Sequence, residues 1–174
     1  MATVIGAVEV RRIQEKIKRR DAHEHGVPTK GKLYAGRLRL RMIPSRTQAE
    51  AVDFVTKNIS PGSTLSTDGW QGYDCLRVNG YKLDSVVLNG NPDLAKSHLP
   101  MIHLVYSNLK TWIKGTHHGV SHRHLQAYLN EYVFRFNRRF YPRGMFNSVL
   151  GISMQTTGPT YTEFYDRNWT HPNP

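Results

Sequence analysis

The chain has 174 residues, enough for one domain with a hydrophobic core, and 39% of them are hydrophobic. Its 24 lysines and arginines outnumber 13 aspartates and glutamates, and the formal net charge of +11 favours a polyanionic partner such as nucleic acid. The single cysteine excludes an internal disulfide, and no apolar run reaches the roughly 18 to 20 residues of a membrane span, so we expect a cytoplasmic protein without a membrane partner.

Two segments near the N-terminus have the composition of strands. Residues 3–10 are β-branched and apolar without a helical period, which predicts a largely buried strand. Residues 11–36 are basic and polar and are interpreted as an exposed connection, in which Ile13 and Ile17 could support a short helix. Leucine and methionine alternate with arginine over residues 37–43, so we expect a strand with one core face and one solvated face.

The next segment combines a helix with a strand that ends in an acidic residue. Thr47, followed by Glu50, forms a capping-box pattern and predicts a helix. Four residues form its apolar stripe: Ala51, Phe54, Val55 and Ile59. Residues 63–67 are a short predicted strand that leads into Asp68 and a glycine. Because α/β proteins place their sites at strand ends, Asp68 is a candidate functional residue.

Further elements are predicted in the second half of the chain. Residues 72–76 are interpreted as a short helical turn and residues 85–89 as a strand. A helix is expected from Pro100 to Gly115, with the glycine as its C-cap, and another from Ser121 as N-cap through Phe136. Beyond Leu150 the sequence is polar without a sustained period, so we expect one domain over residues 1–152 and a tail over residues 153–174.

The helix that begins at Pro100 has two different faces. On a helical wheel, His103, Ser107, Lys110 and Lys114 fall on one side, and the opposite side carries apolar residues. A solvated polar face explains such a pattern without any function. The order of the elements favours a functional role for this face, because an RNase H-like domain also takes metal ligands from neighbouring strand ends and from a helix that crosses nearby.

Two long motifs carry a specific resemblance. STDGWQGY and LPMIHLVYSNLKTWIKGTHHGVSHRHLQAYLNEYVFRFNRRF are similar to the DDE transposases of bacterial insertion sequences, in the group numbered fifteen-ninety-five with its xanthomonad-type members. The similarity runs from Ala2 to about Ile152 and is most specific between Lys110 and Arg139. It implies an α/β, RNase H-like mixed sheet flanked by helices.

The resemblance implies roles for several residues. Asp68 matches the second catalytic aspartate, a ligand of Mg²⁺ or Mn²⁺, and His103 stands where relatives place the third catalytic residue, with Asn108 as the alternative. Lys110 matches a lysine that contacts a phosphate of bound DNA. The DNA-facing residues implied or suggested are Lys110, Lys114, His117, His118, Arg135, Arg138 and Arg139.

One departure from the family concerns the first catalytic aspartate. Relatives carry a strand of the form VEVDETYIGG, whereas Val10 is followed here by Arg11. Either Arg11 has replaced the aspartate, or the chain begins after that strand and residues 3–10 are the second strand; the spacing favours the second explanation. The sheet would then lack its central strand, and we expect marginal stability unless an upstream segment or another chain fills the gap.

The leading hypothesis is therefore a transposase domain for metal-dependent DNA cleavage and strand transfer, with activity doubtful because the first aspartate is missing. The alternatives are a non-catalytic DNA-binding remnant and a general nucleic-acid-binding module. DNA is the expected partner, with a second copy or a full-length transposase as a possible protein partner.

We expect no zinc at residues 21–26 or at the histidines after residue 116, since no CxxC pair accompanies them. Trp70 and Tyr73 could stack on bases or pack in the core.

Overall fold

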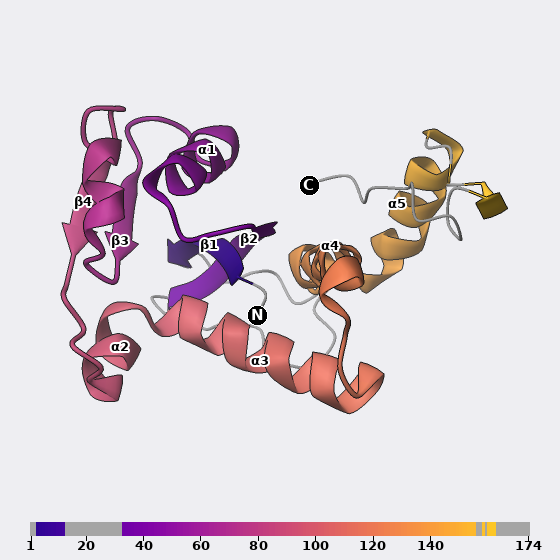
Figure 1. The fold of residues 1–174 in the computed structure, drawn as a ribbon. Helices are drawn as coiled ribbons and strands as arrows, with labels where there is room; N and C mark the ends of the chain where they lie inside the picture. Colours follow the sequence, from indigo (N-terminus) through magenta and orange to yellow (C-terminus); the bar gives the residue numbers. More distant parts are fainter. Residues whose placement is uncertain (1–2, 13–32, 156–157, 159, 163–174) are drawn as a thin grey trace.

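The computed structural model describes residues 3–12, 33–155, 158 and 160–162 (Figure 1). The described elements are β1 Thr3–Arg12, β2 Leu33–Ile43, α1 Gln48–Asn58, β3 Thr64–Thr67, the 3₁₀ helix η1 Gln71–Leu76, β4 Lys82–Ser85, α2 Pro92–His98, α3 Pro100–His117, the 3₁₀ helix η2 His122–His124, α4 Leu125–Arg138 and α5 Pro142–Gln155. None of the described helices is both long enough and apolar enough to cross a bilayer.

Four strands form two small sheets within the described residues. β1 and β2 are antiparallel, with Thr3 opposite Ile43 at one end and Arg11 opposite Tyr34 at the other. β3 and β4 are parallel, and Leu65 pairs with Leu83. The predicted mixed α/β class is confirmed, and small sheets flanked by helices are consistent with an RNase H-like fold.

Helices cover both faces of the β1–β2 pair, which lies between α1 and α3 in Figure 1. On one face, Leu38 and Leu40 of β2 are fully buried and pack with α3 and α4. On the other face, Ile5 and Ala7 of β1 pack against a cluster around Phe54 of α1. That second cluster also includes hydrophobic residues of β3, β4 and η1, so α1 joins the two sheets through side chains.

The side chains of α4 bind the outer edge of β2. Asn137 accepts a hydrogen bond from the Leu38 amide at 2.7 Å, and its own amide donates to the Leu38 carbonyl at 3.1 Å. Gln126 accepts from the Met42 amide at 2.8 Å. On the β1 side, the Tyr106 hydroxyl of α3 donates to the Val4 carbonyl at 3.4 Å. The Leu38 amide and carbonyl and the Met42 amide at the β2 edge are therefore satisfied without another strand.

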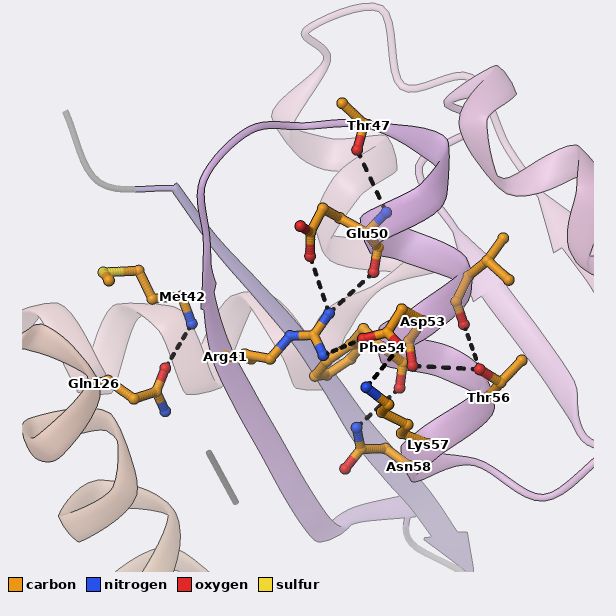
Figure 2. Close-up of polar contacts among 11 residues, drawn as sticks. Arg41, Met42, Thr47, Glu50, Asp53, Phe54, Thr56, Lys57, Asn58 and Gln126 are labelled. Carbon is orange, nitrogen blue, oxygen red and sulfur yellow. Dashed lines mark hydrogen bonds and ion pairs between the residues drawn. The ribbon is translucent and has the colours of Figure 1, made fainter. Parts of the chain in front are cut away.

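The prediction for the second strand is partly wrong. Its apolar alternation is confirmed, because Leu38 and Leu40 are both fully buried. Its arginine face is not simply solvated, however. Arg41 donates to Asp53 at 2.6 Å and to Glu50 at 3.2 Å, and its guanidinium lies over Phe54 (Figure 2). The packing of α1 on this face, which the local pattern does not encode, turns Arg41 inward.

The helix α1 confirms the capping-box prediction. The Thr47 hydroxyl accepts a hydrogen bond from the Glu50 amide at 3.4 Å, and Ala51, Phe54 and Val55 are buried. The predicted short helical turn is present as η1, and the strand before Asp68 is β3.

Several predicted boundaries are wrong. The strand expected at residues 85–89 is β4 at Lys82–Ser85, because β3 has only four residues and pairs with that earlier segment. Strands extend into the expected connection at residues 11–12 and 33–36, and the helix considered near Ile13 and Ile17 lies outside the described residues.

The ends of the two long helices also differ from the prediction. α3 continues past Gly115, and its C-cap is His118, whose φ of 53° is left-handed. Ser121 precedes the short η2 rather than α4, and its side chain makes no capping hydrogen bond. The sequence after Pro142, interpreted in part as a tail, forms α5 up to Gln155.

Candidate active site and nucleic-acid interface

Asp68 directly follows β3, as the sequence predicts. Gly69 then turns the chain at a φ of +75°, and a Cβ at this position would lie 2.9 Å from the backbone nitrogen of Val87. Both the left-handed backbone and the close approach therefore require glycine. The turn fixes the direction in which the Asp68 carboxylate leaves the end of β3.

Both carboxylate oxygens of Asp68 have hydrogen-bond donors. Oδ1 accepts from the backbone amide of Trp70 at 3.3 Å, and Oδ2 accepts from Nη2 of Arg46 at 3.3 Å. The Asp68 side chain is 40% exposed and that of Arg46 is 56% exposed, so water screens this ion pair. Sequence reasoning did not identify Arg46. Its residue type and its polar loop between β2 and α1 carry no signal for such a contact.

Aromatic side chains support the Asp68–Arg46 pair. The Arg46 guanidinium carbon lies 4.5 Å from the centroid of the Trp70 ring, and Trp70 meets Tyr73 edge-on at 5.1 Å. Burial raises the pKa of Tyr73, the Asp68 charge raises it further, and Arg46 opposes that rise. Tyr73 also packs on the α1 cluster, which corresponds to the core alternative considered for these two aromatic residues.

Two of the candidate residues on α3, His103 and Lys110, lie on the face that the helical wheel predicts to be polar. His103, Asn108 and Lys110 are exposed, whereas Val105 and Leu109 are buried. Five residues separate His103 from Asn108, about 140° around the helix, so the two side chains point in different directions. They are therefore alternatives for one role rather than partners in it.

Tyr106 places the first half of α3 against the sheet. Its hydroxyl binds Val4, burial raises its pKa well above the ordinary 10.0, and Tyr73 is a further electrostatic cause of that rise. Tyr73 in turn responds to Asp68.

The described residues do not form a complete centre for a divalent ion. Within residues 3–12 and 33–155, no group of three or more His, Cys, Asp or Glu side chains is arranged to hold a metal. Mg²⁺ prefers hard oxygen ligands in octahedral geometry, and Asp68 supplies one carboxylate that already binds Arg46. Residues 21–26, considered for zinc, lie outside the described residues.

Arg11 lies far along the sheet from this site. It pairs with Tyr34, whereas Arg46 follows the end of β2 at which Ile43 pairs with Thr3. Eight residue steps along β1 correspond to about 26 Å. The Arg11 side chain instead forms an ion pair with Glu9 at 2.7 Å. Arg11 therefore lies toward the other end of the β1–β2 pair from the Asp68–Arg46 contact.

The predicted DNA-facing residues divide into two groups. Lys110, Lys114 and His118 are exposed on α3 or at its end, and Arg135 of α4 is also exposed. Arg135 forms an ion pair with Glu131 at 2.8 Å and lies 6.0 Å from the Trp112 ring centroid of α3. The contact with Trp112 places Arg135 of α4 against a side chain of α3.

The second group points inward or packs on rings. His117 lies between Trp112 and Tyr128, with ring centroids 4.8 and 4.6 Å away, and its Nε2 is buried without a hydrogen-bond partner. Arg138 stacks on Phe134 at 3.9 Å. Arg139 donates to the carbonyls of Ala35 and Phe136, and burial lowers its pKa.

The fold and the position of Asp68 at the end of β3 define an α/β domain consistent with the RNase H-like class. The family model of the ISXO2-like transposase domain matches residues 2–137, and the chain belongs to this family. The resemblance inferred from the two motifs is thereby confirmed, although the match ends before Ile152. Searches of curated proteins and of solved structures each gave no significant match. Family membership supports a DNA transposase function, with DNA as the partner.

Proposed function

We propose that this chain is a transposase catalytic domain that binds insertion-sequence DNA along α3 and α4 but is defective in cleavage and strand transfer. The observation that carries the proposal is the position of Asp68, at the end of β3 and bound to Arg46. A cytoplasmic location, with access to bacterial DNA, is part of the same proposal.

The proposed roles follow from chemistry and exposure. Asp68 is the carboxylate ligand of a divalent ion, and His103, or alternatively Asn108, is the α3 group directed at the same site. Lys110 holds a phosphate of the DNA, with Lys114 one turn further along the helix. A bound Mg²⁺ or Mn²⁺ would activate the attacking oxygen and stabilise the leaving oxygen. One carboxylate with one imidazole holds such an ion weakly, which is why we expect defective chemistry.

Strand transfer tests this proposal directly. The purified 174-residue chain is incubated with a transposon-end duplex and target DNA in Mg²⁺ or Mn²⁺, beside the variant Asp68→Asn. We expect no product above the level of that variant, while both proteins still retard the duplex in a gel. Strand transfer by the unmodified chain but not by Asp68→Asn would refute the proposed defect.

A second candidate function is a non-catalytic DNA-binding remnant that occupies transposon ends or joins a full-length transposase. It is favoured by the same ion pair, because Arg46 neutralises the carboxylate that a metal would need. This candidate predicts that Asp68→Asn leaves both metal and DNA binding unchanged. A transposase site built on Asp68 predicts instead that the substitution removes the metal binding that the chain has.

A further strand is proposed beside β1. α4 side chains occupy the outer edge of β2, and the two sheets are not paired with each other in the described residues. An upstream segment or another chain that adds a strand next to β1 would supply partners for its remaining backbone groups. This proposal is supported by those edges, and it explains the expected marginal stability of the isolated chain.

A further inference from the structure

The Arg46 side chain ends in a flat cationic group over an aromatic ring. Its guanidinium carbon lies 4.5 Å from the centroid of the Trp70 ring, and more than half of the side chain is exposed. We propose that this guanidinium, supported by Trp70, is a stacking site for an unpaired nucleobase of single-stranded DNA. The proposal rests on the proposed DNA-binding function and adds a contact to bases, whereas Lys110 and Lys114 are proposed to contact phosphates.

Trp70 is a fixed support for the guanidinium. Its ring meets Tyr73 edge-on, with the centroids 5.1 Å apart, and Tyr73 packs on the buried cluster around α1. Gly72 also approaches the indole closely, because a Cβ at this glycine would lie 2.3 Å from Cη2 of the Trp70 ring. Since Arg46 lies over the ring, the guanidinium is the surface that a base would meet.

Asp68 holds the guanidinium at a second point. Its Oδ2 accepts a hydrogen bond from Nη2 of Arg46 at 3.3 Å, and its Oδ1 accepts from the Trp70 amide at the same distance. The Arg46 backbone is held as well, because the next residue, Thr47, is the N-cap of α1. A guanidinium that is already oriented loses less conformational freedom when a base stacks on it.

The Asp68 carboxylate favours a base over a phosphate as the ligand of Arg46. A phosphate bound to the guanidinium N–H groups would lie close to the negative charge of Asp68, which would repel it. A nucleobase is uncharged, and its π face attracts the guanidinium whatever the base type. In a duplex the neighbouring bases cover that face, so the ligand must be an unpaired base.

Arg11 offers a matched control. It forms an ion pair with Glu9 at 2.7 Å, and the two side chains are 50% and 43% exposed, close to the 56% and 40% of Arg46 and Asp68. Arg11→Lys keeps the positive charge and removes the guanidinium plane, as Arg46→Lys does. Because Arg11 lies toward the other end of the β1–β2 pair, it controls for the loss of an exposed guanidinium elsewhere on the chain.

Stacking is measured by fluorescence anisotropy with a labelled oligothymidylate of about ten nucleotides, within the footprint of single-strand sites. An abasic strand of the same length carries the same phosphates without bases. We expect Arg46→Lys to weaken binding of oligothymidylate about fivefold, the lower end for the loss of one stacked base, and to bind the abasic strand like the unmodified chain. Arg11→Lys should match the unmodified chain on both strands. Thermal melts of the variants check folding.

Equal binding of oligothymidylate by Arg46→Lys and the unmodified chain would overturn the stacking site, and so would equal losses on oligothymidylate and the abasic strand. A phosphate contact would appear instead with Arg46→Gln. That variant would then lose affinity equally for the two strands, and its salt slope would become less negative by about 0.7.

The outcomes separate this inference from the proposed function. If the unmodified chain binds neither duplex nor single-stranded DNA, the proposed DNA binding is wrong and the stacking site falls with it. If the chain binds the duplex but Arg46→Lys has no effect on oligothymidylate, DNA binding stands and the stacking site alone is wrong.

Discussion

Three arginines of this chain show how the partner of a guanidinium decides its role. Arg41 is held by two carboxylates of α1 and is only 12% exposed. Arg139 is half-buried, and it donates to backbone carbonyls of β2 and α4. Arg46 remains exposed, on a single carboxylate and one ring. Only Arg46 of these three can change partners at a small cost in free energy, because moving Arg41 or Arg139 would leave buried polar groups unpaired.

His117 gives a residue-scale prediction about stability. Its Nε2 is buried without a partner between two aromatic rings, and such a group costs about 1–3 kcal/mol. We expect His117→Phe to preserve or raise the free energy of unfolding, because the ring contacts persist. His117→Ala should lower it, through the loss of packing. Urea denaturation measures both, and a strongly destabilised His117→Phe would show that the imidazole nitrogen has a structural partner.

Tyr106 gives a prediction about alkaline pH. Burial raises its pKa in the folded chain above the ordinary 10.0. The contribution of Tyr106 to the free energy of unfolding is therefore fully present below about pH 10. It falls above that value because the unfolded chain loses the proton while the folded chain keeps it. The slope is about 1.4 kcal/mol per pH unit for one group. The free energy of unfolding of Tyr106→Phe, measured by urea denaturation, should fall less steeply between pH 9 and 11 than that of the unmodified chain. Equal slopes would contradict this.

At the scale of elements, the helices and strands that keep their predicted places have a strong local signal. α1 has its capping box, and β2 has its alternation of leucine and arginine. β4 and α5 have no such local signal: β4 lies earlier in the chain than the predicted strand, and α5 was not predicted. β4 forms where β3 offers a partner, and α5 contacts the rest of the chain mainly through α4 and buries none of its residues. Apolar side chains of α5 such as Phe146 and Met154 are exposed, so its apolar residues do not mark a single buried face.

Asn137 gives an element-scale prediction about the edge of β2. Its side chain satisfies both the amide and the carbonyl of Leu38, which are partly buried. Asn137→Ala leaves both groups without this partner, so we expect the free energy of unfolding to fall by about 2 kcal/mol. Asn147→Ala, at an exposed position of α5, should change it little. Equal effects of the two substitutions in chemical denaturation would argue against the edge role of Asn137.

At the scale of the whole molecule, net charge and the division of the sheet matter most. The formal charge of +11 attracts DNA without specifying a sequence. Among the described residues, α1 joins the two small sheets through side chains, those of the second core cluster and the ion pairs of Arg41. The isolated chain should therefore be less cooperative than a domain with one continuous sheet.

Salt dependence gives the whole-molecule prediction. Each phosphate neutralised contributes a slope of about −0.9 to the logarithm of the DNA association constant against the logarithm of salt concentration. Lys110→Gln with Lys114→Gln should make the slope less negative by about 1 to 2. Lys57→Gln, on α1, should leave the slope unchanged. Anisotropy titrations across a salt series measure it, and an unaltered slope in the double variant would remove α3 from the DNA interface.

The sequence alone determined the features that depend on neighbouring residues. The Thr47 to Glu50 spacing predicts the start of α1, the alternation of β2 predicts its core face, and STDGW places Asp68 at a strand end and indicates the family. Each of these signals lies within a few residues, where propensity and periodicity act.

Tertiary structure decided which distant groups meet. Arg46 and Asp68 are 22 positions apart, and Asn137 and Leu38 are 99 apart. The inward turn of His117 likewise depends on Tyr128, on the following helix. No local pattern encodes such pairs, because they form only when separate elements pack and exclude water between them. The family could therefore be inferred from the sequence, whereas the counter-ion on its candidate carboxylate required the fold.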